Sequence, residues 1–276
     1  MFTLNCNGRL LIIDKPIVMG IINATPDSFF AGSRQSSVDA ALKQAESMLQ
    51  QGATILDIGG QSTRPGSEPV KESQEADRVL PIIEAVAKAF PNAFISVDTF
   101  YANVARQSTA AGAAIINDVS GGTLDANMLQ TVGALHIPYI CMHIKGTPQT
   151  MQQYATYEDV VKEVLDYFIQ RLSDCKAAGI HDVIVDPGFG FAKTIAHNFK
   201  LLQHLSVFKI LEKPILSGFS RKGTIQKTIN VTAAEALNGT TVLNTISLLN
   251  GANILRVHDV KEAMEAIQLV EAYKGS

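Results

Sequence analysis

Short apolar runs rich in β-branched residues recur along the chain, and each breaks at a polar residue or a glycine. The clearest run covers residues 183–185, ends at Asp186 and is stopped by Pro187 and Gly188. Other runs of this kind lie at 18–23, 55–59, 94–98, 115–118, 139–143, 215–218 and 254–257. We therefore predict eight buried strands, each with polar chemistry at its C-terminal end.

Segments with helical periodicity fill the gaps between these strands. They predict helices at 38–49, 72–90, 101–110, 127–135, 157–177, 199–211, 233–249 and 260–273. Glycines such as Gly52 and Gly251 supply the left-handed conformation in which a helix turns back into a strand. The strand–helix unit repeats without a linker, which favours parallel strands with helical crossovers. We predict an α/β fold, a (β/α)8 TIM barrel, as a single domain over residues 1–276.

A short hairpin is predicted ahead of this repeat. Residues 2–4 and 10–13 are apolar and flank the turn-forming segment 5–8, which ends in Gly8. We expect this N-terminal β-hairpin, within residues 1–16, to cap one end of the barrel.

Composition narrows the functional classes. The chain of 276 residues is 46% apolar and 18% charged, which permits a sizeable core. Its net charge of −3 argues against a nucleic-acid-binding surface as the main function but allows a local cationic pocket. Cys6, Cys141 and Cys175 lack Cys-x-x-Cys spacing and indicate thiols in a reducing compartment. Without an N-terminal apolar signal segment or a long apolar run, the sequence predicts a soluble, cytoplasmic protein with no membrane contact.

In a β/α barrel, catalytic groups lie at the C-terminal ends of the strands and in the loops that follow them. The polar residues at these positions are Asn23, Asp57, Asp98, Asn117, Asp118, His143, Asp186, Ser220, Arg221, Lys222, Arg256 and His258. The opposite strand ends carry mostly Gly, Ala, Pro and Lys. This one-sided distribution predicts a polar site at one end of the barrel.

The case for a functional role differs among the acidic residues. Asp186 ends a β-branched run with no helix directly after it, so it has no obvious capping role. Asp98 shares a strand face with Ser96, which fits a site-facing position, but it could equally cap the next helix. Asp57 precedes a glycine pair and could serve that turn instead. Of the neighbours Asn117 and Asp118, one can face the barrel mouth, and we interpret the other as a cap.

The cations gather in the last two loops. Ser220, Arg221 and Lys222 lie in a glycine-bounded loop after the seventh strand, where barrels commonly bind phosphate, although a solvated surface pair is the alternative. Arg256 interrupts an apolar run, and it lies two residues before His258, so both side chains point to the same face of the strand. This placement favours a role for both in the functional site. Zinc-type ligand spacing is absent, and we interpret His143 as structural. Carboxylates, an amide and cations together suit a flat heterocycle rich in N–H donors, bound beside a phosphate.

These residues fall within segments that closely resemble the dihydropteroate synthase family. The matching segments are NATPDSF (23–29), DIGGQSTRPG (57–66), SVDT (96–99), INDV (116–119), MH (142–143), DPGFGF (186–191), SRK (220–222) and RVHD (256–259). The family resemblance implies a (β/α)8 barrel that joins 6-hydroxymethyl-7,8-dihydropterin diphosphate to 4-aminobenzoate, giving 7,8-dihydropteroate and diphosphate in folate synthesis.

The resemblance also implies roles for individual residues. Its pterin-binding residues correspond to Asp98, Asn117, Met142, Asp186 and Lys222. Its diphosphate-binding residues correspond to Arg64, Arg256 and His258, with Asn23 helping to ligate Mg²⁺. Its aminobenzoate pocket, where sulfonamides compete, corresponds to Thr63, Pro65, Phe191 and Ser220. Members of the family are typically homodimers. This sequence departs from the usual pattern in the first loop, at Ala24, Phe30 and Ala31.

The implied mechanism is a dissociative substitution in which Asp98, Lys222 and Arg256 act on the reacting groups. The cations and Mg²⁺ neutralise the leaving diphosphate, and Asp98 stabilises positive charge on the pterin methylene. The loops that begin near Asn23 and Gly60 then close over the site. Alternatives are a corrinoid-dependent methyltransferase barrel, a non-catalytic pterin-binding paralogue and a sugar-phosphate barrel enzyme. The first would not need the gathered cations, and the last would not explain Asp98, Asn117 and Asp186 together.

Overall fold

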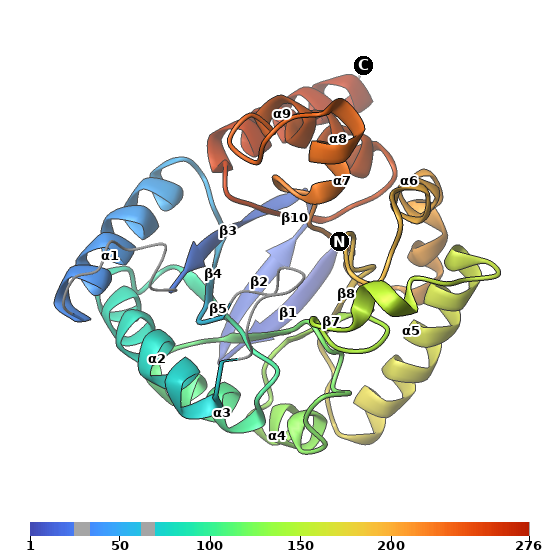
Figure 1. The fold of residues 1–276 in the computed structure, drawn as a ribbon. Coiled ribbons are helices and arrows are strands. Elements are labelled where there is room, and N and C mark those ends of the chain that lie inside the picture. The colour runs from blue at the N-terminus through green and yellow to red at the C-terminus, as the bar shows by residue number, and fades with distance from the viewer. Residues whose placement is uncertain (25–33, 62–69, 276) are drawn as a thin grey trace.

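The computed structural model describes residues 1–24, 34–61 and 70–275. Within them, a sheet of eight parallel strands curls into a barrel that is surrounded by helices (Figure 1). The predicted β/α barrel with a separate N-terminal hairpin is confirmed. None of the helices in this described part of the chain has the length and apolar character needed to span a bilayer.

The barrel strands match the predicted apolar runs closely. They are β3 (Ile17–Asn23), β4 (Ile55–Gly59), β5 (Phe94–Asp98), β6 (Ile115–Asp118), β7 (Tyr139–Met142), β8 (Val183–Asp186), β9 (Leu216–Ser217) and β10 (Ile254–Val257). Hydrogen bonding follows the order β8-β7-β6-β5-β4-β3-β10-β9. The seam between β8 and β9 is held by a bridge between Val185 and Ile215, and the Val185 amide donates to Pro214 at 2.9 Å. Because pairing at this seam is sparse, β9 is shorter than the predicted run at 215–218.

The helices agree with the prediction except around the sixth and seventh strands. They are α1 (Arg34–Gln50), α2 (Glu72–Ala89), α3 (Ala102–Ala111), α4 (Met128–Leu135), α5 (Val160–Ala177), α6 (Ile195–Gln203), α7 (Gly223–Ile229), α8 (Leu237–Leu249) and α9 (Val260–Gly275). Short 3₁₀ segments are η1 (Met151–Tyr154) and η2 (Leu205–Leu211).

The predicted helix at 199–211 was wrong in both extent and type. It begins earlier because the Thr194 hydroxyl caps α6 by accepting from the His197 amide at 3.2 Å, and it passes into the 3₁₀ segment η2 after Gln203. The predicted helix at 233–249 begins only at Leu237, and the short α7 before it was missed. A seven-residue helix offers too few turns for its periodicity to be recognised.

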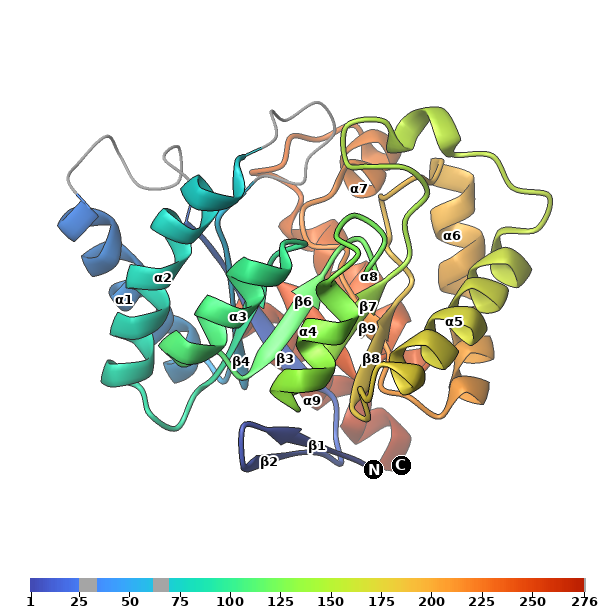
Figure 2. The ribbon, with the colours of Figure 1, turned by 90° about the horizontal axis from the view of Figure 1, so that it is seen from below.

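The half of the barrel interior that lies toward the N-terminal ends of the strands is apolar, and the hairpin closes it. Inward side chains of the barrel strands, including Ile140, Ile184 and Ile254, form one cluster with the inner face of β1 (Phe2–Cys6) and β2 (Arg9–Ile13). The hairpin lies beneath the N-terminal ends of the strands (Figure 2), where Arg9 donates to the carbonyls of Pro91 and Ala93. The polar chemistry is therefore confined to the opposite end.

Candidate functional site

Polar side chains replace the apolar ones at the next inward positions of the same strands. Strand alternation points Ser96 and Asp98 into the barrel and turns Ile95 and Val97 toward the helices, as predicted. In register, Asp57 lies beside Ser96 and Asn117 beside Asp98. The C-terminal end of the barrel thus brings residues that are distant in sequence into one buried layer.

Arg256 on β10 joins two acids in this layer. Its Nε donates to Asp57 Oδ2 at 2.6 Å, and its Nη2 donates to Asp98 Oδ2 at 2.7 Å. Asn117 Nδ2 donates to the same oxygen of Asp57 at 3.0 Å. Burial opposes the charge on Arg256, but the two neighbouring carboxylates outweigh it and raise the pKa of the guanidinium. Arg256 is therefore a permanent cation at the centre of the site.

Asp98 titrates near neutrality in this surrounding. Burial raises the pKa of its carboxyl to about 7, Arg256 opposes that rise and the charge of Asp57 adds to it. A carboxyl group poised in this way can ionise when a cationic group approaches it.

Asp186 and Lys222 form the second part of the layer. Asp186 Oδ1 accepts from the Gly188 amide at 2.8 Å, and burial raises the pKa of this carboxyl. Lys222 Nζ donates to the Phe189 carbonyl at 2.7 Å and lies 4.7 Å from the centre of the Phe191 ring. Burial lowers the pKa of Lys222 to about 8, although Asp186 opposes that shift. An acid and a cation beside an aromatic face suit a flat, hydrogen-bonding ring.

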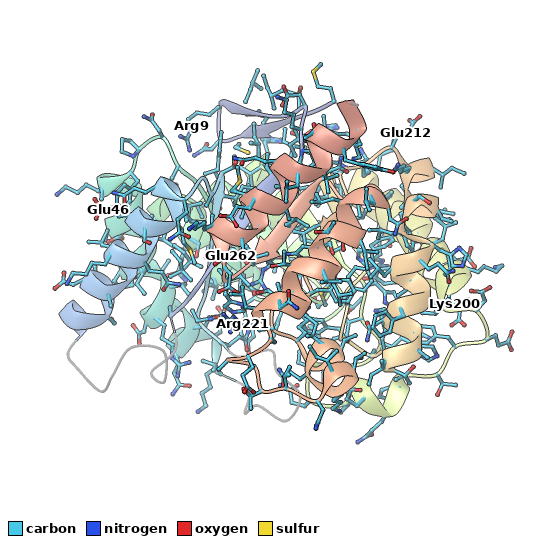
Figure 3. All side chains as sticks on the ribbon, turned by 90° about the horizontal axis from the view of Figure 1, so that it is seen from above. Arg9, Glu46, Lys200, Glu212, Arg221 and Glu262 are labelled. Carbon is cyan, nitrogen blue, oxygen red and sulfur yellow. The ribbon has the colours of Figure 1, made fainter. Side chains whose placement is uncertain are left out.

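The structure separates the two adjacent cations after β9. Lys222 turns toward the site, whereas Arg221 donates to both oxygens of Asp259 at 2.9 Å and to the carbonyls of Ala233 and Ala234. Figure 3 shows Arg221 at the barrel end opposite the hairpin residue Arg9. The surface-pair alternative therefore fits Arg221, which is structural, but it does not fit Lys222.

Ser220 and His258 connect the last two loops. The Ser220 hydroxyl lies 2.8 Å from His258 Nδ1 and accepts from the His258 amide at 3.1 Å. Asn23, at the end of β3, is half-buried and lies beside Gly59 in register. These residues lie at the same end of the barrel as the acids.

Apolar walls flank the polar layer. Met142 packs in a small buried cluster that includes Val119 and Phe191. Phe189 stacks on Phe219 with ring centres 4.0 Å apart and belongs to the main core. Of the two phenylalanines in this loop, Phe191 therefore borders the site and Phe189 belongs to the core.

Several predicted residues lie outside the described part of the chain. These are Thr63, Arg64 and Pro65, together with most of the first loop, 25–32. Asp118 accepts from Ser120, Gly122 and the Tyr139 hydroxyl. It is therefore the one of the pair Asn117 and Asp118 that caps the turn after β6, a choice that the sequence left open.

Three buried polar residues were missed or undervalued. Asp57 was interpreted as an equally good turn residue, yet its inward parity matches that of Asp98 and identifies it as part of the site. Lys193 lies buried with its Nζ 2.9 Å from His143 Nδ1 and donates to the Phe191 carbonyl at 2.9 Å. Glu75 is fully buried in the first turn of α2. Neither Lys193 nor Glu75 interrupts an apolar strand, so the sequence carried no signal for them.

The described residues hold no cluster of three or more His, Cys, Asp or Glu side chains that could bind a metal. Asn23 offers a single amide oxygen. This donor set fits a Mg²⁺ ion that takes its remaining ligands from phosphate oxygens and water, as Mg²⁺ commonly does.

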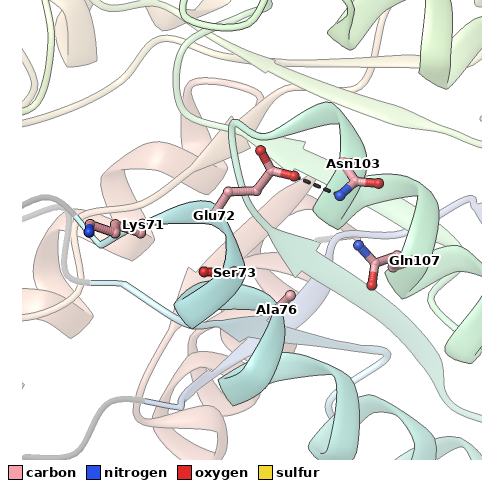
Figure 4. Close-up of a pocket in the computed structure, with 6 residues that line it drawn as sticks. All are labelled: Lys71, Glu72, Ser73, Ala76, Asn103 and Gln107. Carbon is pink, nitrogen blue, oxygen red and sulfur yellow. Dashed lines mark hydrogen bonds between the residues drawn. The ribbon is translucent and has the colours of Figure 1, made fainter.

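A separate cavity of about 510 Å³ lies between the N-terminal parts of α2 and α3 (Figure 4). It is lined by Lys71, Glu72, Ser73, Ala76, Asn103 and Gln107. Glu72 Oε1 accepts from Asn103 Nδ2 at 2.6 Å across it. None of the barrel-end residues lines this cavity, so it is distinct from the candidate site.

Comparisons with known proteins agree on one family. The pterin binding enzyme family matches residues 19–258. The dihydropteroate synthase of Escherichia coli K12 is 43% identical over 267 residues, which cover 96% of this chain and 94% of the relative. The Yersinia pestis dihydropteroate synthase structure with a sulfonamide drug complex has a TM-score of 0.93 and 41% identity, and all of both chains is covered. A Xanthomonas albilineans dihydropteroate synthase in complex with 7,8-dihydropteroate has a TM-score of 0.90 and 36% identity, with 99% of each chain covered.

Proposed function

Because this chain belongs to the pterin binding enzyme family, among its dihydropteroate synthases, we propose that it condenses a pterin diphosphate with 4-aminobenzoate. The substrate is 6-hydroxymethyl-7,8-dihydropterin diphosphate, and the products are 7,8-dihydropteroate and diphosphate. The convergence of Asp98, Asn117, Asp186, Lys222 and Arg256 at one barrel end supports this proposal most strongly. The dihydropteroate and sulfonamide bound to the related structures support it independently.

The pterin lies in the layer of acids in this proposal. Asp186 accepts hydrogen bonds from the guanidine-like edge of the ring, while Asn117 and Lys222 complete the polar contacts and Met142 lines the wall. Charge-assisted hydrogen bonds of this type contribute about 1.5–3 kcal/mol each. Asp98 stays close to the methylene carbon at which the reaction takes place.

The diphosphate binds at the cationic side of the site. Arg256 and His258 contact it, together with Arg64 from outside the described residues. Arg256 is bonded to Asp57 and Asp98 in the present arrangement, and the diphosphate competes with these acids for the guanidinium. As one of those bonds lengthens, Asp98 becomes available to the pterin.

The aminobenzoate pocket is formed by Phe191 and Ser220, with Thr63 and Pro65 from the undescribed loop. A sulfonamide occupies the same pocket in this proposal. The C–O bond to the diphosphate breaks and the leaving group takes the electron pair, so the pterin methylene becomes positive. Asp98 stabilises that charge until the aniline nitrogen attacks with its lone pair and releases a proton. Arg256 and Lys222 hold the leaving and reacting groups in place.

Asn23 is the described residue that would contact Mg²⁺, and the ion would add positive charge beside the leaving diphosphate. Residues 1–276 act as one pterin-binding domain in this proposal, with 1–16 as its hairpin cap. The homodimer and the cytoplasmic location stay predictions from the sequence.

One assay tests the function. Purified protein is mixed with Mg²⁺, the pterin diphosphate and 4-aminobenzoate, and both diphosphate and dihydropteroate are measured. We expect product formation that depends on aminobenzoate and is inhibited by a sulfonamide. The absence of such product from folded protein would contradict the proposal.

A further inference from the structure

Glu75 is a buried acid to which the proposed reaction gives no role. It lies in the first turn of α2 with none of its surface exposed. An acidic side chain in the first turn of a helix is usually exposed to water. There it interacts favourably with the helix dipole and loses no hydration. Full burial of a carboxyl group is unfavourable unless its surroundings compensate for the lost water. Its immediate neighbours therefore indicate what it does.

One oxygen of Glu75 is bound to the segment that leaves β4. Gln61 Nε2 donates to Glu75 Oε2 at 2.6 Å. Gly60 allows this close approach, because a Cβ atom there would lie only 2.9 Å from Glu75 Cγ. Arg78, one turn further along α2, donates to the Gly60 carbonyl at 2.8 Å. The start of α2 therefore holds the end of β4 through two contacts.

The other side of Glu75 faces the turn that carries Asp98. Thr99 and Asp98 are its polar neighbours there: against the larger effect of burial, which raises the pKa of Glu75, the Thr99 hydroxyl lowers it and the charge of Asp98 raises it further. Asp98 itself packs on the residue before Gly60, because a Cβ atom at Gly59 would lie 3.3 Å from the Asp98 Cβ. Thr99 is itself held in place, because its amide donates to the Asn117 carbonyl at 3.0 Å. Its hydroxyl accepts from the Tyr101 amide at 3.1 Å. Glu75 thus lies between the ends of β4 and β5.

The carboxyl group is suited to carry a proton there. Its second oxygen, Oε1, is buried and has no hydrogen-bond partner among the described residues. Burial is the main cause that raises the pKa of Glu75 to about 8; Thr99 and Arg78 lower it, and Asp98 and Glu72 raise it. Below that pH the neutral carboxyl accepts from Gln61 and places no second negative charge beside Asp98.

We propose that Glu75 is a positioning residue for the condensation, which links Gln61 at the end of β4 to the Thr99 turn and so fixes where Asp98 lies. The inference rests on the proposed function, because Asp98 matters only if it contacts the reacting pterin. Glu75 touches neither substrate and acts through Thr99 and Asp98.

The test compares Glu75→Gln and Glu75→Ala with wild type, using the full-length protein and both substrates. We expect Glu75→Ala to lower kcat about 10- to 100-fold, because small displacements of a positioned group are costly. We expect Glu75→Gln to stay within about threefold at pH 7, because the amide keeps the shape and neutrality of the protonated acid. Glu72→Gln is the matched control, a change in the same helical turn but away from Gln61, and it should leave the kinetics unchanged.

The pH profile separates positioning from simple stability. Above pH 8 wild type gains a negative charge beside Asp98, whereas Glu75→Gln does not. That charge opposes the ionisation of Asp98, whose pKa is also raised, to about 7, so the ratio of kcat for Glu75→Gln to that of wild type should rise between pH 7 and 9. Titration of Lys222 occurs in both proteins and cancels in the ratio. A flat ratio, or wild-type kinetics in folded Glu75→Ala, would overturn the proposal.

Two further readouts keep the test decisive. If Glu75→Ala does not fold, Gln61→Ala, which removes the hydrogen bond between β4 and Glu75, takes its place beside the pH ratio of Glu75→Gln and should lower kcat in the same way. Calorimetric binding of 7,8-dihydropteroate should follow the same order, with Glu75→Ala weakened and Glu75→Gln unchanged. Absence of wild-type turnover would count against the proposed function itself, and equal dihydropteroate binding by all variants would count against the role of Glu75.

Discussion

The two ends of the barrel are built from the same strands but have opposite chemistry. On β8, Ile184 belongs to the apolar cluster above the hairpin, and Asp186 lies two residues later at the polar end. On β10, Ile254 and Arg256 show the same change. The same strands and the same alternation of side chains run through both ends, so the inward side chains decide the role of each end. The end that the hairpin closes stabilises the fold, and the end formed by the C-termini of the strands keeps charges that a substrate can use.

The polar end keeps these charges at a cost in stability. Asp57 Oδ1 and Ser96 Oγ are buried without hydrogen-bond partners among the described residues. The ion pairs of Arg256 are partly shielded from water, and such pairs often do no more than offset their own desolvation. Unsatisfied groups of this kind persist where function requires them. Substitutions at the two ends should therefore separate binding from stability.

The largest effect is expected at Asp186. Asp186→Ala removes the acceptor for the pterin edge, which is worth two charged hydrogen bonds or about 3–6 kcal/mol. We expect pterin affinity to fall at least about 100-fold, while the free energy of unfolding falls by no more than about 1–3 kcal/mol, because the Gly188 amide loses its acceptor. Calorimetry with a pterin ligand and denaturant unfolding measure the two quantities. A large loss of stability with intact binding would reverse the assigned roles of the two ends.

Ile184→Ala on the same strand is the opposite test. It leaves a cavity in the apolar cluster and should lower the free energy of unfolding by about 2–5 kcal/mol. Turnover per folded molecule should not change, because the site-facing residues keep their positions. Denaturant unfolding and kinetics of the folded fraction provide the check, with Ile184→Val as a milder control. A selective loss of kcat would show that the two ends are coupled.

The sequence located functional residues on the strands more readily than those in loops and helices. The apolar runs identified every barrel strand, and parity along a strand placed Asp98 and Arg256 in the site. The alternation of side chains along β4 would also have placed Asp57 inside the barrel, but the two glycines that follow it favoured a role in a turn. Lys193 and Glu75 are buried only by tertiary packing of a loop and a helix, so their local sequence resembles that of solvated residues.

The limits of periodicity explain the helix errors. The cap at Thr194 and the short α7 depend on single hydrogen bonds and a few residues. A pattern of apolar spacing averages over several turns and cannot locate such features.

The free energy of unfolding should also depend on pH through Asp98 at the polar end, with a smaller effect than the substitutions above. The pKa of Asp98 is raised from 3.8 to about 7 in the folded protein, so the folded state binds this proton more tightly than the unfolded chain. The stabilising contribution is therefore complete below about pH 4 and is lost as pH rises toward 7. In substrate-free protein, wild type should lose roughly 1–4 kcal/mol relative to Asp98→Asn between pH 4 and 7.5. Denaturant unfolding at several pH values measures this difference, and a constant difference would show that Asp98 ionises normally.

Arg221 and Lys222 offer the finest comparison, because adjacent cations have opposite orientations. Arg221 is held by Asp259 and two carbonyl groups on the partly exposed side of the loop. Arg221→Met should therefore lower the free energy of unfolding, because Asp259 and both carbonyl groups lose their donor, but it should leave KM for the pterin diphosphate unchanged. Lys222→Met, measured in parallel, should raise that KM because it removes the cation next to Phe191 and the acids. If Arg221→Met raised KM as much as Lys222→Met does, both cations would serve the substrate, and the sharp boundary between site and scaffold within this loop would be wrong.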